Sequence, residues 1–372
     1  MNRTHFDYWL LITTILLIAG GIVMVYSASA MLAADQYGDA YYFLKKEIVF
    51  VVLGALFAVA AANVPYGWWR RAVYPLLGLS IVLIVLTYVP GFRSVASGAA
   101  RWLRVGPLTF QPSELAKVAF ICFLAYSLEK KEGKLDRFGV GVCPHLLVGG
   151  VLMVLILGEK DLGSVCTMGA VMMCMLFVSG ARLVHLVAIT LAALPVVYYA
   201  IAGVAYRRAR ILAFLDPWSD RYGSGFQIIQ SLVSFHQGGV WGRGLGEGQQ
   251  KLFYLPEAHT DFIAAVLGEE LGLIGMVVLV SLFMVFALRG FSVASRAPDR
   301  FGRYLALGVT LLIGVEVIAN LCVVMGILPT KGMVLPFISY GGSSLLVSMT
   351  AVGVLLNVST YGTPRAARQV ES

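Results

Sequence analysis

Carboxylates gather where one apolar stretch begins, and their spacing suits acid–base chemistry. Glu257, His259 and Asp261 lie in the run Pro-Glu-Ala-His-Thr-Asp, and Glu269 and Glu270 follow inside the apolar stretch. A carboxylate such as Asp261 can take a proton from a hydroxyl group, which makes it a candidate general base. An aspartate at a helix start is also a common capping residue, so both interpretations stay open. The glutamate pair lies roughly 12 Å further along the helix, where contact with lipid is very unfavourable for carboxylates.

Positive charge that could compensate an anionic ligand is spread over several segments. The candidate cations are Arg101, Lys117, Arg210, Arg243 and Lys331. Glu114 and Lys117 are three residues apart in the segment after Pro112, which suits the first turn of a helix, so they lie on one helix face. They form either a structural ion pair or the polar lining of a cavity.

A glycine-rich tract at 242–248, Gly-Arg-Gly-Leu-Gly-Glu-Gly, resembles a phosphate-binding loop. It matches neither nucleotide-binding pattern, because Glu247 replaces the third glycine and no Gly-Lys-Ser/Thr follows. A flexible backbone near a ligand and an ordinary glycine-rich loop are therefore both open interpretations.

The apolar segment 329–344 is interrupted by proline and glycine, which predicts irregular backbone that is buried or lines a watery cavity. Lys331 would then face the same cavity as Asp261. On the preceding apolar run, Glu316 and Asn320 are four residues apart and are expected to bond to each other in helix packing.

The composition places these segments in an integral membrane protein. Of the 372 residues, 59% are hydrophobic and only 13% are charged, whereas soluble domains carry about 25% charged residues. Apolar runs near 20 residues predict an all-α polytopic bundle of about ten transmembrane helices. The expected spans are 9–29, 46–64, 73–89, 113–128, 143–158, 164–180, 183–204, 261–288, 304–326 and 343–361.

The loop charges predict that both termini are cytoplasmic. In this orientation lysine and arginine divide 14 to 13 between the two sides, and 14 to 7 without the long segment 205–260, because long loops are weak topology signals. We expect one transmembrane domain over 1–361, a large extracytoplasmic loop at 205–260 between the seventh and eighth spans, and a cytoplasmic tail at 362–372. The net charge of +8 suits anionic membrane lipid rather than nucleic acid, because the cations lie between apolar runs.

Together these segments resemble the SEDS family, which contains FtsW, RodA and SpoVE. The similarity runs over nearly the whole chain, and the tracts that carry it are 254–263 with 268–272, 329–332 and 336–344. The Pro-Thr-Lys-Gly form of 329–332 and Ala258 look more like the FtsW division branch than the RodA elongation branch. The resemblance implies a peptidoglycan glycosyltransferase that polymerises lipid II into β-1,4 glycan strands on the outer face of the cytoplasmic membrane during cell division.

The resemblance also implies roles for individual residues. Asp261 takes the place of the family's essential aspartate and is expected to be the general base for the acceptor sugar hydroxyl. The departing undecaprenyl diphosphate needs positive charge, either from protein cations or from a divalent ion such as Mg²⁺ or Mn²⁺. The residues expected to bind diphosphate and sugar are Arg101, Trp102, Glu114, Lys117, Arg210, Arg243, Glu257, His259, Lys331 and Ser343.

The implied partners are lipid II, a class B penicillin-binding protein that supplies the transpeptidase, other divisome proteins and membrane lipid. Two other functions fit the same residues. A lipid II flippase would need the same polar cavity, cations and lateral opening, but with alternating access. A non-catalytic divisome scaffold would lose only partner binding when its outer charges are removed.

Overall fold

Ten helices of the computed structural model coincide with the ten expected spans, within the described residues 6–96, 99–105, 108–252 and 255–362. The largest differences are at the ends of the first and eighth spans, which continue about two turns further. This confirms the predicted all-helical polytopic architecture. The helices are α1 (Tyr8–Tyr37), α2 (Tyr42–Asn63), α3 (Gly67–Thr87), α4 (Pro112–Lys130), α5 (Cys143–Gly158), α6 (Leu162–Val178), α7 (Leu183–Ala202), α10 (Ile263–Arg296), α11 (Arg300–Val324) and α12 (Gly342–Ser359).

Side-chain caps and turn residues set several helix ends. Asp7 accepts a hydrogen bond from the backbone N–H of Leu10 at 3.1 Å where α1 begins, and Gly38 ends α1 in the left-handed conformation at φ 69°. Asp161 and Asp299 cap α6 and α11 in the same way as Asp7. An apolar segment in lipid can satisfy its backbone hydrogen bonds only by forming a helix. These caps and turn residues therefore decide where each helix begins and ends.

Seven helical stretches in the described part of the chain are long and apolar enough to cross a membrane. One of them joins α5 to the short π-helix η1 (Phe138–Val142). Of the other three helices, α6 has 17 residues, while α2 and α4 carry ionisable groups. Glu47 of α2 and Lys117 of α4 are 2% and 5% exposed, so these groups face the bundle rather than lipid.

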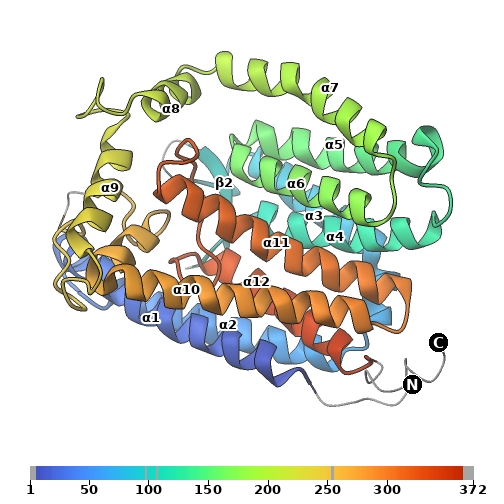
Figure 1. Cartoon of the computed structure of the whole chain (residues 1–372), viewed down its shortest axis with the longest axis horizontal. Coiled ribbons are helices and arrows are strands. Elements are labelled where there is room, and N and C mark those ends of the chain that lie inside the picture. Colours follow the sequence, from blue (N-terminus) through green and yellow to red (C-terminus); the bar gives the residue numbers. More distant parts are fainter. Residues whose placement is uncertain (1–5, 97–98, 106–107, 253–254, 363–372) are drawn as a thin grey trace.

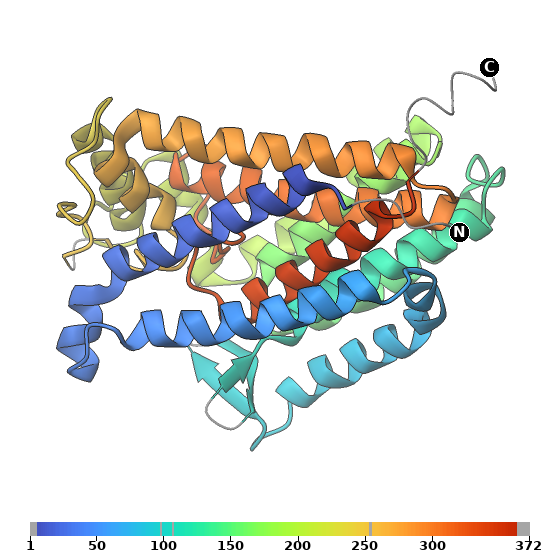
Figure 2. The same ribbon diagram turned by 90° about the horizontal axis from the view of Figure 1, so that it is seen from below.

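The centre of the bundle is formed by α4, α11 and α12, with α10, α1 and α2 packed around them (Figures 1 and 2). The contact between α2 and α12 is very close. A side chain at Gly353 of α12 would lie 2.8 Å from the Cα atom of Ala58 in α2, so only glycine fits there. Small residues of this kind are typical where membrane helices approach backbone to backbone.

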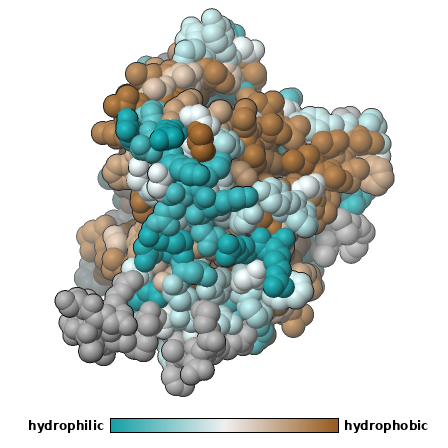
Figure 3. All heavy atoms as spheres, turned by 90° about the vertical axis from the view of Figure 1, so that its right-hand side faces the viewer, coloured by the Kyte–Doolittle hydropathy of each residue, from teal (hydrophilic) through white to brown (hydrophobic). Residues whose placement is uncertain are grey.

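Both ends of the transmembrane domain meet at one end of the bundle. The backbone N–H of Asp7 donates to the hydroxyl of Ser359 at 3.2 Å, and Arg289 pairs with the Asp7 carboxylate at 2.5 Å. This end, seen in Figure 3, carries a band of hydrophilic side chains between hydrophobic flanks. The first and last helices therefore start and finish on the same side, as the sequence predicts for an even number of spans.

The opposite end carries structure that the sequence did not predict (Figure 1). A three-stranded antiparallel sheet of order β1-β2-β3 precedes α4, with β1 (Arg93–Ala96), β2 (Ala99–Val105) and β3 (Leu108–Phe110). The segment 205–260, expected as a loop, contains α8 (Ala205–Leu215) and α9 (Phe226–Gly238). The segment between α11 and α12 is non-helical, as its proline and glycine content predicted. All but one residue of the expected tail 362–372 lies outside the described residues.

Candidate active site

Asp261 lies in a tight turn directly before α10. The backbone N–H groups of Thr260 and Phe262 both donate to the carbonyl of Glu257 at 3.2 Å, and Glu257 adopts φ 56°, which is unusual for a residue other than glycine. The N-cap residue of α10 is Phe262, and no side chain caps this helix. The capping interpretation of Asp261 is therefore wrong, and its carboxylate is not used to start the helix.

The segment between α11 and α12 packs directly against Asp261. Asn320 of α11 donates through Nδ2 to the carbonyl of Asp261 at 2.9 Å and to that of Met333 at 2.6 Å. A side chain added at Gly332 would lie 3.3 Å from Oδ2 of Asp261. The expectation that Asn320 bonds to Glu316 is wrong, because Asn320 instead joins two irregular segments whose carbonyls have no helical partner.

Burial, followed by the negative charge of Glu257, raises the pKa of Asp261 from 3.8 to about 7. Arg210 and Arg101 lower this pKa and partly offset the effect. Asp261 as a whole residue keeps part of its surface exposed, so its burial is incomplete. A carboxylate with a pKa close to neutral is suited to general base catalysis, because it is ionised in part and binds a proton well.

Three of the predicted cations lie around this turn. Arg210 of α8 donates to the carbonyl of Thr330 at 3.0 Å, which places it beside Lys331. Lys331 contacts Sγ of Cys166 in α6 at 3.2 Å. Arg101 of β2 is half-buried, and its Nε is buried without a hydrogen-bond partner in the described part of the chain. The charges of Arg101 and Arg210 act on Asp261, and Lys331 precedes Gly332, which packs against the Asp261 carboxylate; contact of these cations with substrate stays a prediction.

A second carboxylate near the site, Asp161, was missed by the sequence analysis. It is 3% exposed, and it accepts hydrogen bonds from the hydroxyls of Ser164 at 2.7 Å and Ser113 at 3.2 Å. Its charge contributes to raising the pKa of Asp261. The signal was the polar run Glu159-Lys160-Asp161 between two apolar spans, at the same membrane boundary as Asp261.

Glu114 and Lys117 form a buried ion pair at 2.9 Å, and Glu316 of α11 bonds to the same ammonium group. All three side chains are less than a tenth exposed. Of the two interpretations that the sequence left open, the structure shows the ion pair, and Glu316 is its third member. It ties α4 to α11 one helical turn before Asn320, and a direct contact of Glu114 or Lys117 with substrate stays a prediction.

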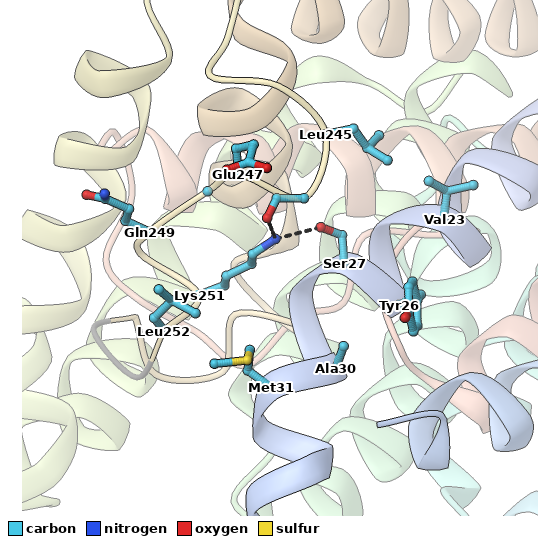
Figure 4. A pocket seen from close by; sticks show the side chains of 12 residues that line it. Val23, Tyr26, Ser27, Ala30, Met31, Leu245, Glu247, Gln249, Lys251 and Leu252 are labelled. Atoms are coloured by element: carbon cyan, nitrogen blue, oxygen red, sulfur yellow. Dashed lines mark hydrogen bonds between the residues drawn. The ribbon is translucent and has the colours of Figure 1, made fainter. Parts of the chain in front are cut away.

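The glycine-rich tract binds carboxylates of the protein itself. The backbone N–H groups of Gly246 and Gln249 donate to Glu270 at 3.0 Å and to Glu269 at 2.8 Å. Lys251 pairs with Glu270 at 2.5 Å and also donates to the Ser27 hydroxyl of α1 at 2.9 Å (Figure 4). A cavity of about 570 Å³ opens beside Ser27 and Lys251, and Asp261 does not line it. The donors that could hold a phosphate are thus used internally, and the tract is a structural loop.

The remaining predicted residues have more distant or structural contacts. His259 packs against the rings of Phe43 at 4.7 Å and Tyr340 at 5.8 Å, and burial lowers its pKa. Ser343 accepts from the backbone N–H of Gln111 at 3.0 Å and so joins α12 to the start of α4. Arg243 lies 3.9 Å from Glu269 at the glycine-rich tract, and Trp102 follows Arg101 on β2.

The predicted Mg²⁺ or Mn²⁺ stays a prediction. Within these residues, no three His, Cys, Asp or Glu side chains are grouped to hold a metal ion. The carboxylates around Asp261 have other partners: Asp161 bonds to serine hydroxyls, and Glu257 accepts from the Thr260 hydroxyl at 2.9 Å. Mg²⁺ is usually held by one or two carboxylates together with substrate phosphates and water, so a metal ion here would depend on the bound diphosphate.

Comparison with known proteins agrees with this geometry. The family model FTSW_RODA_SPOVE, described as cell cycle protein, matches residues 8–363. The chain is 47% identical over 362 residues to the probable peptidoglycan glycosyltransferase FtsW of Geobacter metallireducens, covering 97% of this chain and 96% of the relative. It is 42% identical over 360 residues to stage V sporulation protein E of Bacillus subtilis, covering 97% and 98%.

Solved structures show the same fold. A chain from a peptidoglycan synthase complex, described as coordinating polymerization and crosslinking, superposes with a TM-score of 0.78 at 29% identity, covering 95% of this chain and 97% of the other. The rod shape determining protein RodA of Thermus thermophilus superposes with a TM-score of 0.69 at 27% identity, covering 96% and 98%. These matches confirm the predicted helical membrane fold and glycosyltransferase class. The chain belongs to the FtsW/RodA/SpoVE family.

Proposed function

We propose that this protein polymerises lipid II on the outer face of the cytoplasmic membrane, with Asp261 as the general base. The observation that carries the proposal is the Asp261 carboxylate, whose pKa is raised to about 7 and which lies among Arg101, Arg210 and Lys331. A base and an anion-binding surface are both needed where a sugar hydroxyl displaces a diphosphate.

In the proposed step the 4-hydroxyl oxygen of the acceptor sugar attacks C1 of the donor sugar. The new C1–O bond forms as the bond from C1 to the diphosphate oxygen breaks, and the hydroxyl proton passes to Asp261. The diphosphate leaves with the bonding electron pair. Arg210 bonds to the carbonyl of Thr330, which precedes Lys331, and these two cations would stabilise the charge that develops on the leaving group.

The lipid chain would reach this site from the side, past α7. In α7, all of which is described, Leu186 is the buried residue, while Val184 and Tyr199 are about three quarters exposed. Figure 1 shows α7 along the edge of the bundle, continuing into α8, which carries Arg210. This loosely packed edge supports entry of a membrane-embedded substrate, which a flippase would also need.

The two ends of the bundle support an outer position for the site. The site lies at the end opposite to the joined start of α1 and end of α12 (Figure 2). With both termini cytoplasmic, as the loop charges favour, the site faces the outside of the cytoplasmic membrane. The similarity to a synthase-complex chain supports a partner, for which we propose a class B penicillin-binding protein, and the similarity to FtsW proteins supports a role in division.

The test is polymer formation from lipid II by purified protein with its partner, comparing wild type with Asp261→Asn. Asn keeps the size of Asp but cannot accept the proton, so we expect glycan chains to disappear. Glu247→Gln, at an exposed carboxylate beside α1, is the matched control and should polymerise normally. Normal polymerisation by Asp261→Asn refutes the base assignment. Lipid II transport without any polymer, in wild type as well, supports the flippase, and partner binding alone supports the scaffold. Removing divalent ions with a chelator tests the predicted Mg²⁺ or Mn²⁺.

A further inference from the structure

The amide of Asn320 is the one side chain that joins Asp261 to the irregular segment 329–334 in the described part of the chain. It is 1% exposed and donates both of its amide hydrogens, one to the carbonyl of Asp261 and one to that of Met333. The two carbonyls belong to turns without a regular backbone ladder. Asn320 therefore fixes their relative position together with one backbone bond between the same segments, from the Tyr340 N–H to the His259 carbonyl at 3.0 Å.

The Oδ1 atom of the same amide is buried and has no hydrogen-bond partner among the residues that the structure describes. A buried acceptor without a partner is destabilising, and in native proteins such groups are few. The protein tolerates this cost at Asn320, and the two hydrogen bonds that the amide donates hold the two segments in one geometry. The amide is held firmly, because Glu316, one turn earlier on α11, is tied to Lys117 of α4.

The two hydrogen bonds of Asn320 flank the contact between the Asp261 carboxylate and Gly332. Oδ2 of Asp261 lies where a side chain of residue 332 would begin, 3.3 Å from its Cβ. Met333 follows Gly332, and Lys331 precedes it, with Arg210 bonded to Thr330. Holding Asp261 and Met333 together therefore sets how close the carboxylate comes to Gly332 and to the cations beyond it.

We propose that Asn320 is a positioning residue that fixes Asp261 against Gly332 and beside Lys331 and Arg210. The inference rests on the proposed role of Asp261 as base, but it concerns a different side chain. Asn320 contacts backbone carbonyls and is enclosed by protein, so its loss should affect the rate of the bound complex more than substrate binding. A displacement of about 1 Å in a reacting group can cost about 100-fold in rate.

The test is the glycan polymerisation rate of Asn320→Leu at several lipid II concentrations and pH values. Leucine has a similar volume and no donor. We expect kcat to fall at least about 10-fold with KM little changed. The acid limb of the pH profile should move to lower pH, because a released Asp261 turn becomes more hydrated and its pKa returns toward the ordinary value. As a control, Thr310→Val removes a buried polar group of the same helix, a hydroxyl that bonds to the Ala306 carbonyl within α11, and should leave activity unchanged.

A second variant changes the contact between Asp261 and Gly332 at the glycine. Gly332→Ala places a methyl group 3.3 Å from Oδ2 of Asp261 and leaves Asn320 unchanged. It should also lower kcat and move the acid limb, and it provides the test if the Asn320→Leu variant does not fold. Lower yield with an unchanged acid limb and unchanged kcat in both variants would mean a purely structural role and overturn the inference. Failure of the base assignment is distinct, because Asp261→Asn would then keep the activity and acid limb of the wild type.

Discussion

The Asp261→Asn variant should be more stable than the wild type, and its advantage should grow with pH. In the folded protein the pKa of Asp261 is about 7, against an ordinary value of 3.8. Below about pH 3, the carboxyl is mostly protonated in both folded and unfolded chains and has little effect on stability. As the pH rises from 4 to 7, the unfolded chain releases this proton while the folded chain retains it, so the wild type loses stability.

The size of the effect follows from the difference between the two pKa values. A gap of three units corresponds to about 4 kcal/mol at pH 8, and to about 1.7 kcal/mol at pH 5. Because Asp261 keeps some exposure, water reduces these values, and we expect about 2 to 4 kcal/mol at pH 8. The neutral amide of Asn does not have this cost at any pH.

The assay is the thermal unfolding midpoint of wild type and variant in detergent, at one scan rate, at pH 5 and pH 8. The difference in Tm should be several degrees at pH 8 and less than half of that at pH 5. Glu247→Gln, which removes an exposed carboxylate, should show no such pH dependence. Equal differences at both pH values, or a wild type more stable at pH 8, would refute the claim that the site holds Asp261 against desolvation.

Three further results are expected. Lys251→Met leaves the Glu270 carboxylate buried without its ion pair, which should cost about 3 to 5 kcal/mol and make the 242–252 segment sensitive to limited proteolysis. Gly353→Leu forces α2 and α12 apart and should abolish the folded, monodisperse peak in size-exclusion chromatography, whereas a substitution to leucine at Gly314, where a side chain meets open space, should not. Arg210→Gln should raise KM for lipid II about 10-fold and move the acid limb of activity to higher pH, measured in the polymerisation assay; an unchanged limb contradicts it.

The length of the apolar runs was enough to predict the ten helices, because in lipid such a run satisfies its backbone hydrogen bonds by forming a helix. The details at the outer end depend on interactions between distant segments, which run length does not encode. The sheet that carries Arg101 is short and pairs only with itself. Nothing in the local sequence around Asn320 indicates that its amide bonds to residues 261 and 333 rather than to Glu316.

The glycine-rich tract is a second case in which the local sequence did not indicate a contact between distant segments. Its composition left two interpretations open, a flexible backbone near a ligand and an ordinary glycine-rich loop, and in the structure its backbone N–H groups bind anions. The anions are the carboxylates of Glu269 and Glu270, which the sequence analysis treated as a separate question of burial in the membrane. Each pattern supplied one half of the interaction, and only the fold of α10 against the tract brings the halves together. Family resemblance selected Asp261 among several carboxylates, which spacing alone did not do.

The opposite shifts expected for Arg210→Gln and Asn320→Leu separate the two influences on the base. Arg210 stabilises the ionised carboxylate of Asp261, so its removal raises the pKa and demands a higher pH for activity. Asn320 carries no charge and acts through geometry, so its removal exposes the carboxylate to water and lowers the pKa. A diphosphate placed beside Asp261 would by itself raise the pKa further and leave the base protonated. Arg210 and Lys331 beside the turn offset that effect, which explains why a site for an anionic substrate needs its cations next to the base and not only around the leaving group.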